Sequence, residues 1–450
     1  MGGKARSPNI LFVFADQMRG VDMGCAGNSQ IVTPVMDRLA EEGVMCSRHY
    51  ATCPLCSPNR ATMLTGTYPT THRLIFNDYP MRTDLASLGT LAKANGCRAG
   101  YVGKWHIDGG PRDRFIPPGP RRLGFDDFWA TLNCGHDYFE FIYYRDDSPT
   151  PVRARGYEPE TQTELAIDFL KQCGRQRPFC LVVSWGPPHN PYEQVPDKYR
   201  RMYDETAIAF RPNCREIPRA VLDPAWSHRP TTRDYYAQIT SLDEMLGRLL
   251  AALDEIGAAQ DTIVVFTSDH GDMMWSQGLL YKCVPFEESI GVPLLLRYPR
   301  GLPRGRVCGA PIGSVDLLPT LAGLAGWTCP GSVEGADFAP VLRGRRPEAD
   351  EPAFIAQYSP YLFRQDFPVP EWRGLRTKRY TFTVTPDRRP WLFFDNDADP
   401  YQMRNLAADP AHQSLAAELT GKLDRKLREI RDPFLPYQEM ADRFNLPQYP

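Results

Sequence analysis

Short apolar segments of strand length alternate with amphipathic helical segments through residues 9–330. NILFVFAD at 9–16 is a predicted strand, and TPVMDRLAEEG at 33–43 is a predicted helix with Thr33 as its N-cap and Gly43 beyond its end. Further helix patterns at 85–96, 163–174 and 240–257 each lead into a strand pattern, at 97–106, 178–189 and 261–271. This alternation predicts an α/β fold in which a large, mostly parallel sheet lies between two layers of helices.

A change in composition at RGRRPEADEP predicts a boundary between a main domain, 1–345, and a smaller unit, 346–450. In the smaller unit, 373–384 and 390–400 have the pattern of antiparallel strands, and 413–430 has the pattern of an amphipathic terminal helix. We therefore expect an α+β subdomain with a short antiparallel sheet and a terminal helix.

Two stretches interrupt the alternation. Residues 111–158 mix arginines with tryptophan and tyrosine, and residues 190–230 are rich in proline and arginine. We expect both to be long excursions over the edge of the sheet. The first is a candidate for holding an anionic sugar, because arginine pairs with carboxylates and sulfates. His136, within it, could line a substrate pocket.

The charged residues nearly balance, with 52 Lys and Arg against 54 Asp and Glu, so no overall field would attract nucleic acid or an acidic membrane. The sequence has no run of about 18 apolar residues for a membrane span, and the apolar run 10–15 is too short for a signal peptide. Twelve irregularly spaced cysteines fit a reducing compartment better than a disulfide framework. We expect a soluble, cytoplasmic protein with no nucleic-acid or membrane partner, and the sequence does not predict its oligomeric state.

Polar residues stand where the predicted strands end. In a parallel sheet these carboxyl ends meet at one edge, and ligands bind there. The residues expected to converge at this edge are Asp16, Gln17, Lys104, His106, His189, Asp269 and His270.

The segment CPLCSPNR at 53–60 is open to three interpretations. Cys53 and Cys56 form a CxxC pair, which in redox proteins lies at a helix start where the dipole lowers a thiol pKa. The pair would also be half of a zinc site, but no second CxxC, CxxH or HxxxH follows at a suitable spacing. In the third interpretation only Cys56 reacts, because Pro58 suits a first helical turn and Arg60 lies on the same helix face as Cys56.

Helix amides, the helix dipole and Arg60 together would make an anion site around Cys56. A nucleophile in such a site suggests attack on a phosphate or sulfate ester. Cys56, Pro58 and Arg60 match the CxPxR pattern of the sulfatase family, and MLTG at 63–66 matches its usual continuation. In that family the cysteine is oxidised to formylglycine, so the resemblance implies that Cys56 is modified and that Cys53 only packs.

The resemblance continues in order along nearly the whole chain. The other segments that look like the family's are NILFVFADQMR (9–19), GKWH (103–106), GPPHNPY (186–192), TSDHGDM (267–273), YKCVPFEESIGVPLLLR (281–297), LLPTLAGLAG (317–326) and FDNDADPYQMRNLA (394–407). The family implies an alkaline-phosphatase-like fold and the hydrolysis of a sulfate monoester to an alcohol and inorganic sulfate.

The modification explains why a cysteine is needed at this position. A thiolate that attacked sulfate would leave a sulfur-linked ester with no internal route of release. The hydrated aldehyde has two hydroxyls: one attacks sulfur and expels the alcohol, and loss of the other's proton then ejects sulfate and restores the aldehyde. The resemblance therefore implies a formylglycine-generating enzyme as a maturation partner.

The resemblance also implies one divalent metal, with the modified Cys56 among its ligands, which lowers the pKa of the attacking hydroxyl at position 56. Asp16, Asp269 and the amide oxygen of Gln17 are hard ligands suited to Ca²⁺ or Mg²⁺. His270 is a softer fourth ligand, which leaves Mn²⁺ open. Ca²⁺ is the favoured ion.

The remaining roles come from the same resemblance. Lys104 would bind the sulfate, and His106 would accept the proton that triggers sulfate release, a role that needs a pKa near neutral. If their strand persists, the two side chains point to one side of it. His189 is the implied leaving-group acid, Lys282 a second sulfate clamp, and Asn77 a candidate contact to the sulfate or the leaving oxygen.

Two other functions stay open. A phosphonate monoester or phosphodiester hydrolase shares the formylglycine but tends to have uncharged hydroxyl residues where this chain has Lys104 and His106. A non-catalytic binding protein would keep the fold and leave Cys56 unconverted. The favoured substrate is a sulfated carbohydrate, with an aryl or alkyl sulfate as the alternative.

Overall fold

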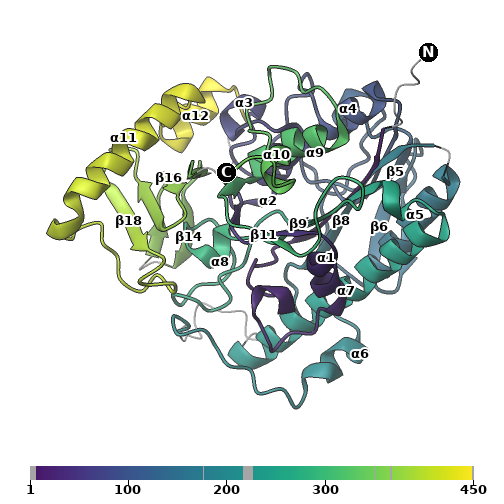
Figure 1. Ribbon diagram of the computed structural model, residues 1–450, viewed down its shortest axis with the longest axis horizontal. Coiled ribbons are helices and arrows are strands. Elements are labelled where there is room, and N and C mark those ends of the chain that lie inside the picture. The colour runs from purple at the N-terminus through teal and green to yellow at the C-terminus, as the bar shows by residue number, and fades with distance from the viewer. Residues whose placement is uncertain (1–6, 176, 216–226, 349, 365–366, 448–450) are drawn as a thin grey trace.

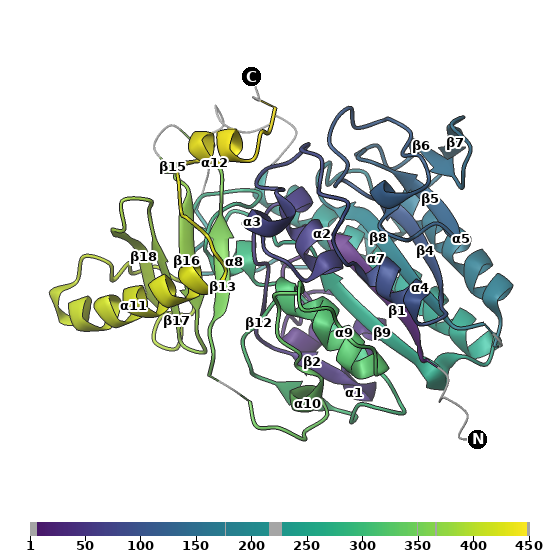
Figure 2. The same cartoon turned by 90° about the horizontal axis from the view of Figure 1, so that it is seen from above.

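The computed structural model describes residues 7–175, 177–215, 227–348, 350–364 and 367–447. Its main sheet has 10 strands and lies between two layers of helices (Figure 1, Figure 2). The strand order is β11 (Arg306–Cys308), β2 (Val44–Cys46), β10 (Leu294–Arg297), β9 (Thr262–Ser268), β1 (Asn9–Asp16), β8 (Phe179–Pro188), β4 (Arg98–Lys104), β5 (Phe128–Leu132), β6 (Glu140–Arg145) and β7 (Val152–Arg155).

The centre of this sheet is parallel. β1 lies between β8 and β9, with Ile10 opposite Cys180 and Ile263, and β4 and β5 continue the parallel run beyond β8. Antiparallel pairing occurs toward the edges, where β10 pairs with β9 and β2, and β6 pairs with β5 and β7. The prediction of a large, mostly parallel sheet between helices is confirmed.

Alternate residues of β1 belong to different cores on the two faces of the sheet. Helices on one face include α2 (Cys56–Thr65), α4 (Leu88–Ala94) and α9 (Leu317–Ala325), and those on the other are α1 (Pro34–Glu42), α5 (Glu158–Cys173) and α7 (His228–Glu255). Ile10 and Phe12 pack with the first set, whereas Leu11 and Val13 pack with the second. Successive strand side chains point to opposite faces, so a strand covered on both sides is apolar at nearly every position.

Both predicted excursions contain regular structure, and the prediction was wrong in this respect. Residues 111–158 supply β5, β6 and β7, which extend the sheet, because Phe128 and Trp129 are buried against it. The segment 190–230 contains α6 (Asp197–Arg200), and α7 already begins at His228; residues 216–226 lie outside the described part of the chain. The many arginines and prolines in these stretches masked the apolar pattern of a strand, and only the tertiary structure shows that the apolar residues between them lie in the core.

The C-terminal part has its own antiparallel sheet, as predicted. Its strands are β13 (Ala353–Gln357), β16 (Trp372–Arg376), β17 (Tyr380–Val384) and β18 (Pro390–Asp395). Helix α11 (Gln413–Glu429) buries Leu419, Leu423 and Leu427, and α12 (Tyr437–Arg443) follows it. These leucines belong to the same apolar cluster as Leu318 of the main domain, so the two parts share a core. The boundary between 345 and 346 stays a prediction.

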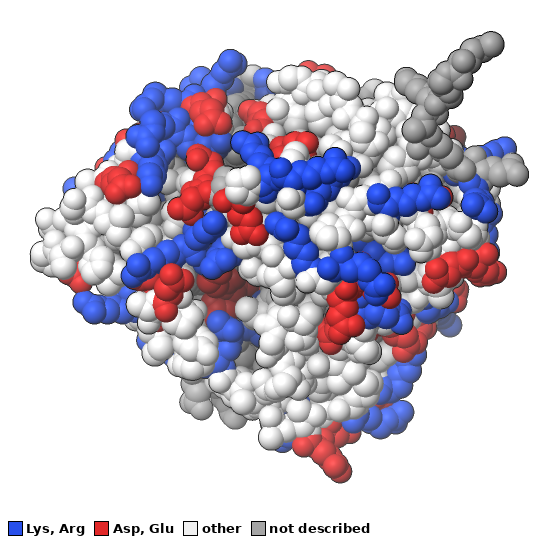
Figure 3. All heavy atoms as spheres, in the orientation of Figure 1, with Lys and Arg blue, Asp and Glu red and all other residues white. Residues whose placement is uncertain are grey.

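The remaining elements are short: β3 (His49–Tyr50), β12 (Ile312–Gly313), the pair β14 (Tyr361–Arg364) and β15 (Phe367–Val369), and helices α3 (Pro69–His72), α8 (Glu287–Ile290) and α10 (Ala339–Leu342). On the face that Figure 3 shows, positive and negative side chains interleave, in keeping with the balanced composition. Among the described residues, no helix has the length and apolarity needed to cross a membrane. The cytoplasmic location stays a prediction.

Candidate active site

Helix α2 presents Cys56 as its first residue. Leu55 before it is extended, Pro58 lies in the first turn, and the helix ends at Gly66, whose φ of 62° is in the left-handed region. Every residue of α2 is buried, so the helix N-terminus and the Cys56 side chain are held inside the protein rather than at its surface. Cys53 is also buried, with its sulfur 3.7 Å from Gln357 Oε1, consistent with packing only.

The Cys56 sulfur lies among three of the predicted metal ligands. It is 3.2 Å from His270 Nε2 and 3.9 Å from Asp16 Oδ1, and the possible ligand atoms of Asp16, Cys56, Asp269 and His270 all lie within 4.8 Å of one another. In a formylglycine enzyme the sulfur would be replaced by oxygen, so Sγ marks the position of the nucleophile. No disulfide or zinc-like cysteine cluster competes for it, since all twelve cysteines are described and free.

The charges of this group fit a bound cation. Burial and the neighbouring Asp16 carboxylate raise the pKa of Asp269. Burial also opposes ionisation of Asp16, but the neighbouring positive charges, of which Lys104 has the largest effect, hold the pKa of Asp16 well below its usual range. Two buried carboxylates facing one imidazole are a hard donor set, and a divalent ion there would offset their repulsion.

Arg60 is fully buried and holds both carboxylates. Its Nη2 donates to Asp16 Oδ2 at 3.0 Å, and its Nε donates to Asp269 Oδ2 at 2.8 Å. Nη1 donates to the Lys104 carbonyl at 2.9 Å and to Ser184 Oγ at 2.7 Å. The guanidinium thus joins the ends of β1 and β4 to Asp269, which follows β9, and to Ser184 within β8. Arg60 is therefore a positioning residue and not only a hydrogen-bond donor to an anion at the helix start.

Gln17 contacts the four-residue group through its backbone N–H, which donates to Asp269 Oδ1 at 3.1 Å, and its side chain has other partners. Its Oε1 accepts from Lys282 Nζ at 2.6 Å, and its Nε2 donates to Asp272 Oδ2 at 2.7 Å. Its backbone has a φ of 71°, which turns the chain sharply after Asp16. Its part in metal binding stays a prediction, while Asp272, which lies within TSDHGDM, was missed because it does not end a strand.

Lys104 is the last residue of β4, and its Nζ lies 2.6 Å from Asp16 Oδ2. The strand does not persist to His106, whose φ of 57° is left-handed, so the expected common strand face does not exist. His106 instead reaches Asp78, with Nε2 3.2 Å from Asp78 Oδ1. Burial opposes protonation, yet Cys134 and Asp78 raise the pKa of His106 to about 10, above the near-neutral value expected from the sequence.

His189 and Lys282 meet beside Gln17, with 3.0 Å between His189 Nε2 and Lys282 Nζ. Burial, followed by Lys282, holds the pKa of His189 well below its usual range. Asn77 has a capping contact, since its Oδ1 accepts from the Ser57 backbone N–H at 3.0 Å. Gln17, Asn77, His189 and Lys282 all lie in loops, where the spacing of residues in the sequence says little about the distance between their side chains.

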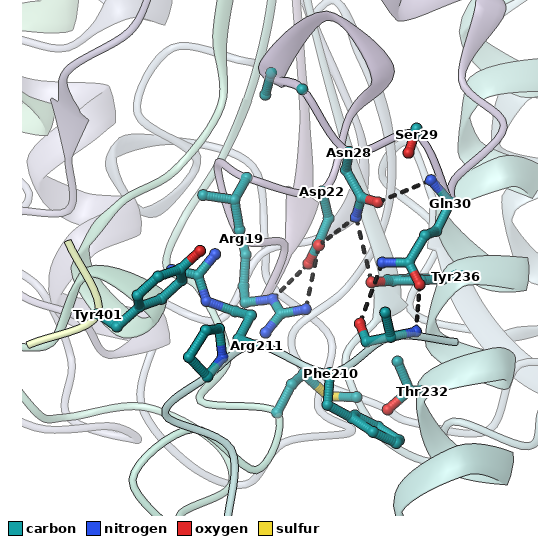
Figure 4. Close-up of a pocket in the computed structure, with 16 residues that line it drawn as sticks. Arg19, Asp22, Asn28, Ser29, Gln30, Phe210, Arg211, Thr232, Tyr236 and Tyr401 are labelled. Carbon is teal, nitrogen blue, oxygen red and sulfur yellow. Dashed lines mark hydrogen bonds and ion pairs between the residues drawn. The ribbon is translucent and has the colours of Figure 1, made fainter. Parts of the chain in front are cut away.

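A network of polar side chains fixes the loop that follows Gln17 and lines a pocket of about 320 Å³ (Figure 4). Arg19 donates through Nε and Nη2 to the two carboxylate oxygens of Asp22, at 2.5 and 3.1 Å. Asn28 donates to Asp22 at 3.1 Å and to the Tyr236 hydroxyl at 3.2 Å. Because Arg19 and Asp22 are buried, this network anchors the chain directly after the end of β1.

The strand ends therefore bring a buried nucleophile at a helix start together with two carboxylates, two lysines and three histidines. Six of the seven residues expected to converge make contacts around Asp16 or Lys282, and His106 lies one step farther out, beside Asp78. Such a site suits a hydrolase of anionic esters, in which cations bind the anion and histidines move protons.

Comparison with known proteins gives the class. The sulfatase family profile matches residues 8–327, and that of the N-sulphoglucosamine sulphohydrolase C-terminal region matches 276–429. The ulvan-active sulfatase of Formosa agariphila is 38% identical over 443 residues, which cover 97% of this chain and 84% of the relative. The N-acetylglucosamine-6-O-sulfatase of Bacteroides thetaiotaomicron is 25% identical over 503 residues, covering 95% and 88%.

A solved structure from Bacteroides fragilis, assigned as sulfatase yidJ, has a TM-score of 0.87 at 29% identity and covers 96% of this chain and 98% of its own. The chain belongs to the sulfatase family, and it is a sulfuric ester hydrolase with the alkaline-phosphatase-like fold.

Proposed function

We propose that this sulfatase removes sulfate from a sulfated carbohydrate, with formylglycine at position 56 as the nucleophile. The observation that carries the proposal is the position of Cys56, buried at the start of α2 within the Asp16, Asp269 and His270 group. The relatives support the substrate class, because one of them is named for the sulfate of N-acetylglucosamine. The overall reaction adds water to R–O–SO₃⁻ and yields the alcohol and hydrogen sulfate.

One divalent metal would be held by Asp16, Asp269 and His270, with Gln17 as the proposed fourth ligand. Bound there, it would lower the pKa of the attacking hydroxyl and bind an ester oxygen. The hard carboxylates favour Ca²⁺, with Mg²⁺ and Mn²⁺ as the other candidates. Arg60 would have a different role from the metal ligands. It hydrogen-bonds to both carboxylates and so fixes their positions.

The proposed roles of the other residues follow from charge and position. Lys104 and Lys282 are buried ammonium groups on two sides of Asp16 and Gln17, so they would bind the sulfate oxygens electrostatically. His106, paired with Asp78, would accept the proton that releases sulfate. His189 would protonate the leaving oxygen once the negative charge of the bound ester offsets that of Lys282, which together with burial holds the pKa of His189 below its usual range. Asn77 stays a proposed substrate contact.

The rival function is hydrolysis of a phosphonate monoester or phosphodiester. Lys104 and His106 favour a sulfate monoester, because the phosphonate hydrolases tend to have uncharged hydroxyl residues at these two positions. In this chain Lys104 contacts Asp16 and His106 contacts Asp78. Rates with an aryl sulfate and an aryl phosphonate discriminate the two functions. A clear preference for the phosphonate would overturn the proposal.

The substrate is found by screening sulfated mono- and disaccharides beside a chromogenic aryl sulfate, after coexpression with a formylglycine-generating enzyme. Mass spectrometry of the intact protein first shows whether Cys56 has exchanged its sulfur for the aldehyde oxygen. Conversion without release of sulfate from any saccharide would reject the carbohydrate substrate, and an unconverted, inactive protein would favour the binding-protein alternative.

A further inference from the structure

The 133–138 segment, between β5 and β6, contacts both histidines that are proposed to move protons. At one end, the Asn133 carbonyl accepts from the His106 backbone N–H at 2.6 Å. At the other end, the Tyr138 hydroxyl donates to the His189 carbonyl at 2.9 Å. One short segment thus contacts both His106 and His189, which are 83 residues apart in the sequence.

Cys134 lies in the middle of the segment, with its side chain turned into the site. Its sulfur is 3.6 Å from His136 Nε2, its backbone N–H donates to the Arg112 carbonyl at 3.0 Å, and the residue is only 4% exposed. The Arg112 guanidinium in turn pairs with Asp78 at 2.6 Å, and Asp78 is the partner of His106. Burial would raise the pKa of this thiol, but Lys104 and His106 outweigh burial and hold it well below its usual range. Cys134 is thus linked to the proposed base through Arg112 and Asp78, and the negative charge favoured on its sulfur adds an attraction for a protonated His106 that favours one orientation of the ring.

His136 stacks on the ring of His189. The ring centroids are 4.2 Å apart and the planes differ by 11°. Burial and Lys104 lower the pKa of His136, so its ring is neutral near pH 7. A neutral stacked ring restricts the orientation of His189 without adding a positive charge that would oppose its protonation when the ester binds.

We propose that Cys134 and His136 are positioning residues of the sulfatase reaction: Cys134 orients the base His106, and His136 orients the acid His189. Neither residue needs to touch the reacting atoms. The inference rests on the proposed roles of His106 and His189, and it adds that a single segment aligns both of them.

Leaving-group dependence tests the His136 half. Phenyl sulfate has a poorer leaving group than para-nitrophenyl sulfate and so depends more on the acid. We expect His136→Ala to lower kcat/KM for phenyl sulfate by about tenfold or more and for para-nitrophenyl sulfate by about twofold or less. His189→Ala should show the same difference between the two substrates, with a larger loss for phenyl sulfate. His136→Phe, which keeps a stacked ring, should recover most of the loss.

The kcat for para-nitrophenyl sulfate tests the Cys134 half, because sulfate release is common to all substrates. Cys134→Ala should lower kcat by about tenfold and shift its pH profile, and Cys134→Ser, which keeps a polar atom at that position, should recover part of the rate. Cys180→Ala, at a buried cysteine of β8 away from the site, is the matched control and should leave the pH profile unchanged. Thermal unfolding of every variant shows whether it is folded.

The outcomes separate this inference from the proposed function. If the parent cleaves sulfate esters and His189→Ala shows leaving-group dependence, but folded His136→Ala slows both substrates equally and His136→Phe restores nothing, the positioning role of His136 is overturned. A folded Cys134→Ala with the parent's kcat and pH profile overturns that of Cys134. A parent that cleaves no sulfate ester overturns the proposed function as well.

Discussion

Lys104 Nζ lies 2.6 Å from Asp16 Oδ2, so a proposed sulfate-binding amine already contacts a proposed metal ligand. Arg60 contacts the same carboxylate oxygen at 3.0 Å. Asp16 therefore contacts a buried structural arginine and a proposed sulfate-binding lysine, in addition to its proposed role as a metal ligand. Changes at any of the three residues are expected to affect more than one of these properties.

Cys56→Ala should abolish hydrolysis of sulfate esters, because no nucleophile remains at the start of α2. Cys53→Ala, three residues earlier, should keep most of the activity, since its sulfur contacts Gln357 rather than the ligand group. Assays with a chromogenic aryl sulfate, together with intact mass spectra of the converted protein, check both expectations. A Cys56→Ala protein that works at the parent rate would contradict the central assignment.

Arg60→Met should destabilise the fold by about 3–5 kcal/mol, because it leaves two buried carboxylates without their shared partner. The free energy of unfolding from urea titration measures the loss. Arg155→Met is the matched control: the Arg155 pair with Glu140 is exposed, at 3.6 Å, and its removal should change the free energy of unfolding by about 0.5 kcal/mol or less. Equal effects of the two substitutions would show that Arg60 does not hold the carboxylates.

Asp78→Asn should lower the pKa of His106 from about 10, because the Asp78 carboxylate is one of the groups that raise it. The base works when it is neutral, so a lower pKa makes it active at lower pH, and the acid limb of the kcat profile should move to lower pH. Profiles of kcat against pH for the parent and the variant measure this shift. Asp84→Asn, at an exposed pair with Arg82, should leave the limb in place.

Removal of divalent metal by a chelator should lower both activity and the temperature of unfolding, because the repulsion between Asp16 and Asp269 is then offset only by Arg60 and Lys104. Adding Ca²⁺ should restore both, and Asp269→Asn should abolish the stabilising effect of Ca²⁺. Thermal scans with increasing Ca²⁺, Mg²⁺ and Mn²⁺ rank the ions. A melting temperature that no ion changes would argue against a metal in this group.

Much of the fold and the site could be predicted from the sequence. The alternation of apolar strand segments with amphipathic helical segments predicted the parallel sheet. Strands buried on both faces must be apolar at nearly every position, as β1 is. The CxPxR spacing selected Cys56 over Cys53. The structure agrees in that α2 begins at Cys56. The strand-end rule found Asp16, Lys104 and Asp269, whose places follow from the parallel order of β1, β4 and β9.

The rest depended on contacts between distant segments. Nothing in local spacing shows that Gln17 turns to Lys282 and Asp272, that His106 leaves its strand for Asp78, or that His136 stacks on His189. The sequence by itself determined the residue types and the order along the chain of the strands that carry them. Only the tertiary structure decided which loop side chains meet, because loop conformation follows from packing and hydrogen bonds with residues far away in the chain, and period carries no information about these.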